Sequence, residues 1–222
     1  MRHPSRSSRP LIVSRAGLRK SQETAVLKPG LTLFFIRHGE TDWNVAQRYQ
    51  GQTDIPLNDN GRGQARRNGR VLAERLGAGA SSFAYVSSPL ERATETMELV
   101  RAGLGLEPAA FAKDARLSEI HFGQWEGQLW GDLPRTDPVG FAARKADTWS
   151  WVPGGGESYA MLADRVAPWL ASLERDTLAV SHGGVSRVVR GLVLGLEGRA
   201  VPGLEVPQDK VLMLRDGAQN WI

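Results

Sequence analysis

Short, fully hydrophobic runs alternate along the chain with longer segments in which hydrophobic residues recur every three or four positions. The run at 31–36 (LTLFFI) follows a Pro-Gly pair and is typical of a strand buried on both faces of a parallel sheet. Strands that alternate with helices at this spacing predict one α/β domain over 31–222, folded as a three-layer α/β/α sandwich with a mostly parallel sheet. The further predicted strands are 83–86, about 110–112, 178–180 and 211–214, and the predicted helices are 58–76, from Ser88 onward, 157–173 and 185–196.

Local signals predict where several of these elements begin or bend. Asn58 or Asp59 is expected to cap the first helix, and Ser88 to cap the second, with Pro89 at its first position. Pro168 is expected to kink the third helix. The strand at 211–214 could close the sheet at one edge.

The alternation breaks down between about residues 120 and 156. Long irregular insertions in compact domains are usually lids or binding loops. We therefore expect 120–156 to form a lid over a binding site. The insertion holds four of the seven tryptophans, each of which could pack the lid or contact a substrate: Trp125, Trp130, Trp149 and Trp151.

Three polar clusters each follow a predicted strand. They are 37–41 (RHGET), 87–92 (SSPLER) and 181–184 (SHGG). Because the carboxyl ends of parallel strands face the same edge of a sheet, these clusters can converge on one crevice. The crevice would hold two arginines, two histidines, hydroxyl groups and backbone N–H groups exposed by glycine.

This set of groups suits a phosphate. Arginine supplies forked donors that match phosphate oxygens, and helix N-termini add partial positive charge. A neutral histidine can attack phosphorus with one ring nitrogen while a hydrogen bond holds the other. Phosphoryl transfer requires mainly positioning and charge stabilisation, which such a pocket provides without a metal or other cofactor.

The leaving oxygen also needs a proton donor. Glu119 is the best candidate because it follows the strand predicted around 110–112 and opens the Trp-rich insertion. A carboxyl group held against aromatic side chains has its pKa raised toward the working pH, as a general acid requires.

Five ordered motifs together give a resemblance to a known family. They span roughly residues 31–215, and in this order the chain resembles the histidine phosphatase (phosphoglycerate mutase-like) superfamily. One of these motifs alone would be a weak signal. The motifs are Arg37-His38-Gly39-Glu40-Thr41 with Trp43-Asn44, 87–93 (SSPLERA), 117–119 (LSE) with 122–127 (FGQWEG), 153–158 (PGGGES) and 181–184 (SHGG).

The resemblance implies a role for each matching residue. It makes His38 the nucleophile that carries the phosphoryl group and Glu119 the proton donor. The residues that it implies as phosphate ligands are Arg37, Arg92, His182 and Asn44, with Thr41 and Gly183 as weaker candidates.

Simpler interpretations remain open for some of these residues. Thr41 could do no more than cap the following helix, and Asn44 could be a local turn former. His3 and His121 match no catalytic position, so we interpret them as surface or core residues.

Both mutases and phosphatases occur in this superfamily. Mutases follow the acid with an Arg-His-Tyr type sequence, whereas this chain has Ile120-His121-Phe122. A lid with no excess of positive charge is a poor clamp for a dianionic intermediate, so we favour a phosphatase resembling broad-specificity and α-ribazole phosphatases over a phosphoglycerate mutase. The charges of the insertion sum to −1, from Arg135, Arg144 and Lys145 against Glu126, Asp132, Asp137 and Asp147.

A non-catalytic phosphate-binding protein on the same fold is the rival from another class. Turnover of a generic aryl phosphate would separate it from an enzyme. A dinucleotide site has no support, because no glycine-rich nucleotide loop follows any predicted strand. The motifs contact only the phosphoryl group, so they do not tell which small phosphomonoester is the substrate.

The composition bounds the class of protein. With 222 residues, 41% of them hydrophobic, the chain can bury an ordinary core, and its lack of cysteine excludes thiolate metal sites and a cysteine nucleophile. No apolar run approaches the roughly 18 residues of a membrane-spanning helix. We therefore expect a soluble, cytoplasmic protein, which could form a homodimer through the last helix and edge strand.

The net charge of +4 comes from the N-terminal segment. Residues 1–30 hold seven basic residues against Glu23 alone, a net +6, so the other 192 residues sum to −2. A nucleic-acid surface on the folded body therefore has little support. We expect 1–30 to be a disordered basic extension, while organellar targeting and a start codon placed too far upstream remain open.

Overall fold

The computed structural model describes residues 27–222, so the prediction of a disordered N-terminal extension falls almost entirely outside the described residues. A single six-stranded sheet forms the centre, in the order β3-β2-β4-β1-β5-β6. Its strands are β1 (Thr32–Arg37), β2 (Ala84–Ser87), β3 (Ala112–Lys113), β4 (Thr177–Ser181), β5 (Val211–Arg215) and β6 (Ala218–Trp221).

The sheet is mixed but mostly parallel. Strands β3, β2, β4 and β1 pair in parallel, whereas β5 pairs antiparallel with β1 and with β6. The strand predicted at 211–214 is therefore β5 and lies inside the sheet, with β6 at the edge. Arg37 pairs with Ser181, and Ser87 with Val180, so the polar segments after β1, β2 and β4 leave the sheet side by side.

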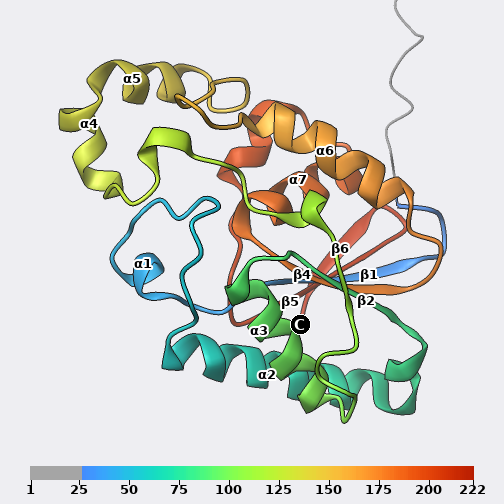
Figure 1. Ribbon diagram of the computed structural model, residues 1–222. Helices are drawn as coiled ribbons and strands as arrows, with labels where there is room; N and C mark the ends of the chain where they lie inside the picture. Colours follow the sequence, from blue (N-terminus) through green and yellow to red (C-terminus); the bar gives the residue numbers. More distant parts are fainter. Residues whose placement is uncertain (1–26) are drawn as a thin grey trace, which may run out of the picture.

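Helices cover both faces of the sheet, as Figure 1 shows. On one face α2 (Asp59–Leu76) and α3 (Glu91–Gly103) pack on Phe34 and Ile36 of β1. On the other face α6 (Tyr159–Ala171) and α7 (Gly183–Leu194) pack on Leu33 and Phe35. Alternate residues of β1 thus enter two separate cores, which confirms the buried strand and the predicted α/β/α sandwich.

Of the four predicted helix starts, that of α2 is right, that of α3 is wrong, and those of α6 and α7 each differ by two residues. Asn58 caps α2 by accepting from the Gly61 N–H. Ser88 is not a helix cap, because α3 begins at Glu91. The cap comes from far along the chain, since the Asp54 carboxylate accepts from the Glu91 N–H at 2.9 and 3.0 Å. The helix predicted at 157–173 is α6, capped by Ser158, and the last helix, α7, begins two residues earlier than predicted.

The insertion at 120–156 is built from short helical pieces. In Figure 1 its helices α4 (Leu133–Thr136) and α5 (Pro138–Ala146) lie beyond the same end of the sheet as α1 (Asp42–Val45). Trp125 is fully buried beneath them and donates to Asp137 at 2.8 Å, so it packs the lid. The short 3₁₀ helices of the chain are η1 (Gly77–Ser82), η2 (Ala115–Leu117), η3 (Gly123–Trp125), η4 (Trp130–Asp132) and η5 (Gly198–Gly203).

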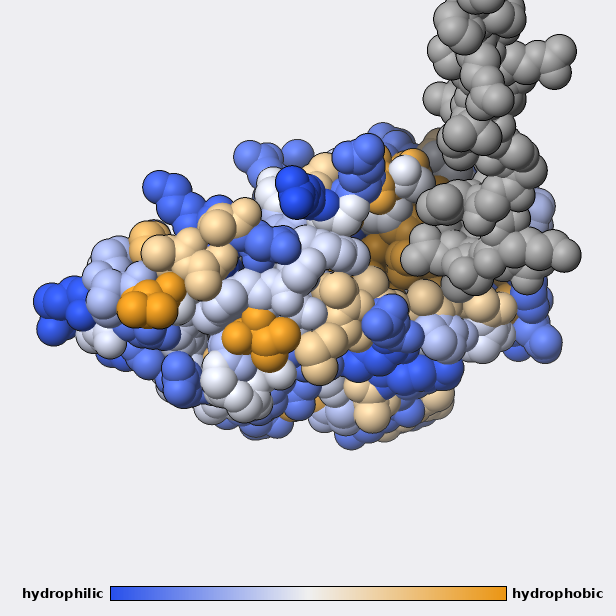
Figure 2. Space-filling view, turned by 90° about the horizontal axis from the view of Figure 1, so that it is seen from above, coloured by the Kyte–Doolittle hydropathy of each residue, from blue (hydrophilic) through white to orange (hydrophobic). Residues whose placement is uncertain are grey.

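The surface over the lid and α6 is mixed in character. Figure 2 shows hydrophobic residues there in small groups among hydrophilic ones. Exposed apolar side chains of this region include Val139, Val152 and Met161. Within residues 27–222, no helix has the length and hydrophobicity needed to cross a membrane. A homodimer and a cytoplasmic location stay predictions.

Candidate active site

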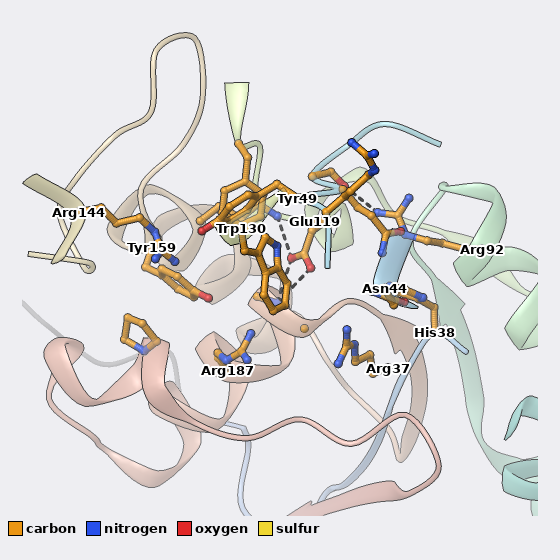
Figure 3. A pocket seen from close by; sticks show the side chains of 18 residues that line it. Arg37, His38, Asn44, Tyr49, Arg92, Glu119, Trp130, Arg144, Tyr159 and Arg187 are labelled. Atoms are coloured by element: carbon orange, nitrogen blue, oxygen red, sulfur yellow. Dashed lines mark hydrogen bonds between the residues drawn. The ribbon is translucent and has the colours of Figure 1, made fainter. Parts of the chain in front are cut away.

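A cavity of about 320 Å³ lies beyond the carboxyl ends of the central strands. It brings together most of the residues that the sequence singled out, as Figure 3 shows. His182 and Thr41 are close by but do not line the cavity. The predicted residues that do line it are Arg37, His38, Asn44, Arg92, Glu119 and Gly183.

The hydrogen bonds of His38 leave one ring nitrogen free. Its Nδ1 lies 2.7 Å from the carbonyl oxygen of Gly39. A carbonyl only accepts, so Nδ1 carries the proton and Nε2 keeps its lone pair. His38 follows β1 directly, and its backbone N–H donates to Ser181 of the neighbouring strand at 2.8 Å. The sheet therefore holds this imidazole with Nε2 available as a nucleophile.

Burial and charge keep His38 and His182 neutral. Desolvation lowers the pKa of both rings well below 6.5, and Arg92 and Arg37 lower it further. The two rings lie close together, with centroids 5.1 Å apart. A neutral His38 is the form that can attack phosphorus.

The low pKa of His38 predicts a specific loss of stability in acid. As pH falls through about 6.5, the unfolded chain takes up a proton that the native ring excludes, so the free energy of unfolding falls. For one histidine the loss is about 1.4 kcal/mol at pH 5.5. Urea unfolding in phosphate-free buffer should show wild type losing about that much more than His38→Asn between pH 7.5 and 5.5. Equal losses would contradict this assignment.

Arg37, which is partly buried, and Arg92, which is fully buried, flank His38, and backbone carbonyls hold each in place. Arg37 Nη1 donates to Val206 at 2.9 Å, and burial lowers the pKa of Arg37 to about 10. Arg92 is fully buried and donates to the carbonyls of Thr53 and Gly51 at 2.8 and 2.7 Å. Both guanidinium groups are thus pre-positioned to bind an oxyanion. Arg92 Nη1 also lies 3.8 Å from the carboxylate of Asp54, whose side chain is 44% exposed.

His182 lies behind this pair and is held by a serine. Its Nε2 is 2.7 Å from Ser88 Oγ. Ser88, which was predicted to cap a helix, therefore holds His182 instead. Among the described residues, three buried side-chain nitrogens lack a hydrogen-bond partner: Arg37 Nε, Arg92 Nε and His182 Nδ1. Unsatisfied buried donors are costly. Their grouping around His38 matches the binding of an oxyanion.

The capping motif of α1 orients the amide of Asn44. Thr41 caps this helix, as the simpler interpretation expected, and its N–H donates to Asn44 Oδ1 at 3.2 Å. Gln208 Nε2 donates to the same oxygen at 3.0 Å and to the His38 carbonyl at 3.0 Å. Because both donors use Oδ1, the Nδ2 amino group of Asn44 is left to face the cavity as a donor.

Gln208 is therefore expected to position two site residues at once. Gln208→Leu removes the side-chain amide that donates to the Asn44 and His38 oxygens. Gln208→Glu sets a carboxylate against the same two acceptor oxygens. We expect kcat/KM to fall about tenfold for the first and further for the second. Inhibition by inorganic phosphate should weaken in parallel. The control is Gln128→Leu, in the lid and away from His38. Unchanged phosphate inhibition in both Gln208 variants would rule the role out.

Glu119 follows η2 and lines the cavity beside the start of α7. Its Oε1 accepts from Ile120 and Gly184 N–H groups at 2.9 and 3.0 Å. A Cβ atom on Gly184 would lie 2.5 Å from that oxygen, so only glycine leaves the carboxylate in place at the start of α7. In Figure 3 Glu119 lies beside Trp130, the lid tryptophan that lines the cavity.

Glu126 holds the loop that carries the carbonyl partners of Arg92. Its carboxylate accepts from the N–H of Gln52 at 3.0 Å and from the N–H and hydroxyl of Thr53 at 3.1 and 2.7 Å. The carbonyls of Gly51 and Thr53 in the same loop accept from Arg92. Glu126 therefore acts on the site through the position of Arg92.

Three further arginines, which were not predicted as site residues, line the cavity. Arg48 follows α1, Arg144 lies on α5, and Arg187 lies one turn after Gly183 on α7. For Arg187 the spacing of four residues from Gly183 was the one available signal, since it sets both on the same face of a helix.

The net charge of the lid sequence does not predict the charge of the cavity. Arg144 lines the cavity, whereas the four lid acids do not. Glu126 and Asp137 are engaged by N–H groups, Asp147 accepts from Trp149 and Ser150, and Asp132 pairs with Arg135 on the surface. Within residues 27–222, no group of three or more His, Cys, Asp or Glu side chains could hold a metal ion.

Comparisons with known proteins identify the family. The model of the histidine phosphatase superfamily (branch 1) matches residues 33–221. The glucosyl-3-phosphoglycerate phosphatase of Mycolicibacterium vanbaalenii is 34% identical over 176 residues, 74% of each chain. The adenosylcobalamin/alpha-ribazole phosphatase of Salmonella typhimurium is 31% identical over 183 residues, 80% of this chain and 87% of that protein.

A solved structure gives the same answer. The mycobacterial glucosyl-3-phosphoglycerate phosphatase in complex with VO3 matches with a TM-score of 0.72 at 30% identity, covering 86% of this chain and 96% of that one. Fold and relatives together define an α/β phosphatase. The chain belongs to the histidine phosphatase superfamily. The predicted family and phosphatase branch are confirmed, and the mutase alternative is less supported.

Proposed function

We propose that this protein hydrolyses a small organic phosphomonoester through a phosphohistidine on His38. In the first step His38 Nε2 attacks phosphorus and the bond from phosphorus to the ester oxygen breaks. Glu119 gives its proton to the departing oxygen, so the alcohol leaves neutral. In the second step water attacks the phosphohistidine, Glu119 takes a proton from that water, and inorganic phosphate leaves.

The single observation that carries this proposal is the set of three unpaired buried nitrogens around a histidine whose Nε2 is free. Arg37, Arg92 and His182 supply donors to the phosphoryl oxygens, and the Asn44 amino group and the Gly183 N–H at the start of α7 add two more. Charge spread over those oxygens in the transition state is stabilised by groups already in place, which is the main requirement of phosphoryl transfer.

The test is to trap the intermediate. Enzyme mixed with a ³²P-labelled aryl phosphate and quenched in alkali within milliseconds should carry label that alkali spares and acid releases, as a phosphohistidine does. His38→Asn should carry none. The matched control is His121→Asn, since His121 lies at the base of the lid and does not line the cavity.

The outcomes separate the enzyme from its rival. Turnover with label on His38 supports the proposal. No turnover and no label, with inorganic phosphate still bound, would favour a non-catalytic phosphate-binding protein. Turnover without acid-labile label would point to direct attack by water and would refute the covalent step.

A further inference from the structure

The cavity carries more positive charge than one phosphoryl group requires. Five arginines line it and Glu119 is its one acidic residue. Of the five, Arg37 and Arg92 flank His38, which leaves three without a part in the proposed reaction. These are Arg48, Arg144 and Arg187.

Two of these arginines lie across Glu119 from the nucleophile. In Figure 3 Arg144, Tyr159 and Arg187 lie on one side of Glu119, and His38 lies on the other side. Arg144 comes from the lid and Arg187 from α7, so two separate elements bring positive charge to the same side of Glu119. Arg48 donates to the Gly127 carbonyl at 2.6 Å at the base of the lid.

Among the ion pairs of residues 27–222, none involves Arg48, Arg144 or Arg187. A Cβ atom on Gly183 would lie 3.3 Å from Arg187 Nη1 and 3.6 Å from Arg37 Nε, so two guanidinium groups flank one backbone position. Arg187 accordingly contributes to the lowered pKa of Arg37. Like charges at this spacing repel unless an anion lies between them.

Both arginines also act on Tyr159. Burial is the main cause of the raised pKa of this tyrosine, and the charges of Arg187 and Arg144 oppose the rise. This side of Glu119 therefore offers two guanidinium groups and one phenol hydroxyl to a ligand. His38 is the one histidine that lines the cavity, and it lies on the other side of Glu119. Guanidinium forks match the planar, singly charged carboxylate.

We propose that the substrate is a phosphomonoester that also carries a carboxylate, and that Arg144 and Arg187 bind this carboxylate while His38 attacks the phosphoryl group. This inference rests on the proposed phosphatase function. The cavity of about 320 Å³ is near the lower limit for small-molecule sites, which suits a compact acid whose two anionic groups are a few bonds apart.

The experiment compares substrates that differ in the carboxylate. 3-Phosphoglycerate is paired with glycerol 3-phosphate, and O-phosphoserine with O-phosphoethanolamine, while an aryl phosphate reports phosphatase activity itself. Wild type should show a kcat/KM at least about tenfold higher for the acid of one pair, as a charge-assisted bidentate contact provides. Arg187→Gln and Arg144→Gln should each reduce that ratio about tenfold, and the double variant should abolish it.

Arg135→Gln is the matched control. Arg135 is also a lid arginine, but its side chain is 76% exposed, pairs with Asp132 and does not line the cavity. This variant should keep the wild-type ratio for both pairs of substrates. A loss of selectivity equal to that of Arg144→Gln would mean that any lid arginine has the same effect.

Each remaining result has one meaning. Hydrolysis of the aryl phosphate without preference for either acid would overturn the carboxylate site and leave the phosphatase function standing. A preference that survives in the double variant would overturn the assignment to Arg144 and Arg187. No hydrolysis of any substrate, the aryl phosphate included, would instead refute the proposed function.

Discussion

His38→Asn should lower kcat by about 10⁴-fold or more, because it removes the side chain that forms the covalent intermediate in the proposed reaction, and losses of this size are typical of nucleophile deletions. Asparagine can still donate to the Gly39 carbonyl in place of Nδ1, so the loop after β1 should keep its course. The measurement is steady-state hydrolysis of an aryl phosphate. A residual rate within a hundredfold of wild type would contradict the role of His38.

Binding of phosphate provides the control for this variant. Arg37, Arg92 and His182 remain in place, so inorganic phosphate should still raise the melting temperature, because a ligand that binds only the folded state stabilises it. Arg92→Met should instead lose both the activity and this stabilisation. If His38→Asn also lost the response to phosphate, its inactivity would reflect a disturbed pocket.

The parts of the site that follow strands could be predicted from the sequence. A run such as 31–36 defines a strand without any knowledge of the fold, and topology requires the residues after it to lie at the carboxyl edge of the sheet. Arg37 and His38 were found for that reason. Glu119 was found in the same way, because it follows β3 after a single 3₁₀ turn.

Residues that act across long separations could not be found in this way. Ser88 resembles a helix cap locally, but it contacts His182 while Asp54 supplies the N–H acceptor for α3. Gln208 lies in a loop 170 positions from His38 and belongs to no motif. Contacts of this kind depend on how loops fold back on the sheet, which local propensity does not encode.

The positive charge of the cavity could not be predicted from the sequence for a related reason. A sum over 120–156 treats Arg144 and the four lid acids as equivalent, but it omits where each side chain points. Short acids beside turns bind nearby N–H groups, as Asp147 does, whereas a long arginine can reach the cavity. Arg187 lies outside the insertion and was not counted at all.

Glu119→Gln should separate proton donation from phosphate binding. The glutamine keeps an oxygen for the Ile120 and Gly184 N–H groups but has no acidic proton to give. We expect kcat/KM for an alkyl phosphate, whose alkoxide needs a proton to leave, to fall about 10²- to 10³-fold, in the range of general acid catalysis. For a nitrophenyl phosphate, whose phenolate leaves unaided, the fall should be less than about tenfold.

Glu126→Gln is the matched comparison, because it also removes one carboxylate from the same region. Glu126 acts through the loop at 51–53 and the position of Arg92, which in the proposed reaction binds the phosphoryl group whatever the leaving group is. Its loss should therefore slow both substrates by the same factor. If Glu119→Gln also slowed both equally, Glu119 would be a positioning residue, and the proton of the leaving oxygen would have to come from elsewhere in the cavity.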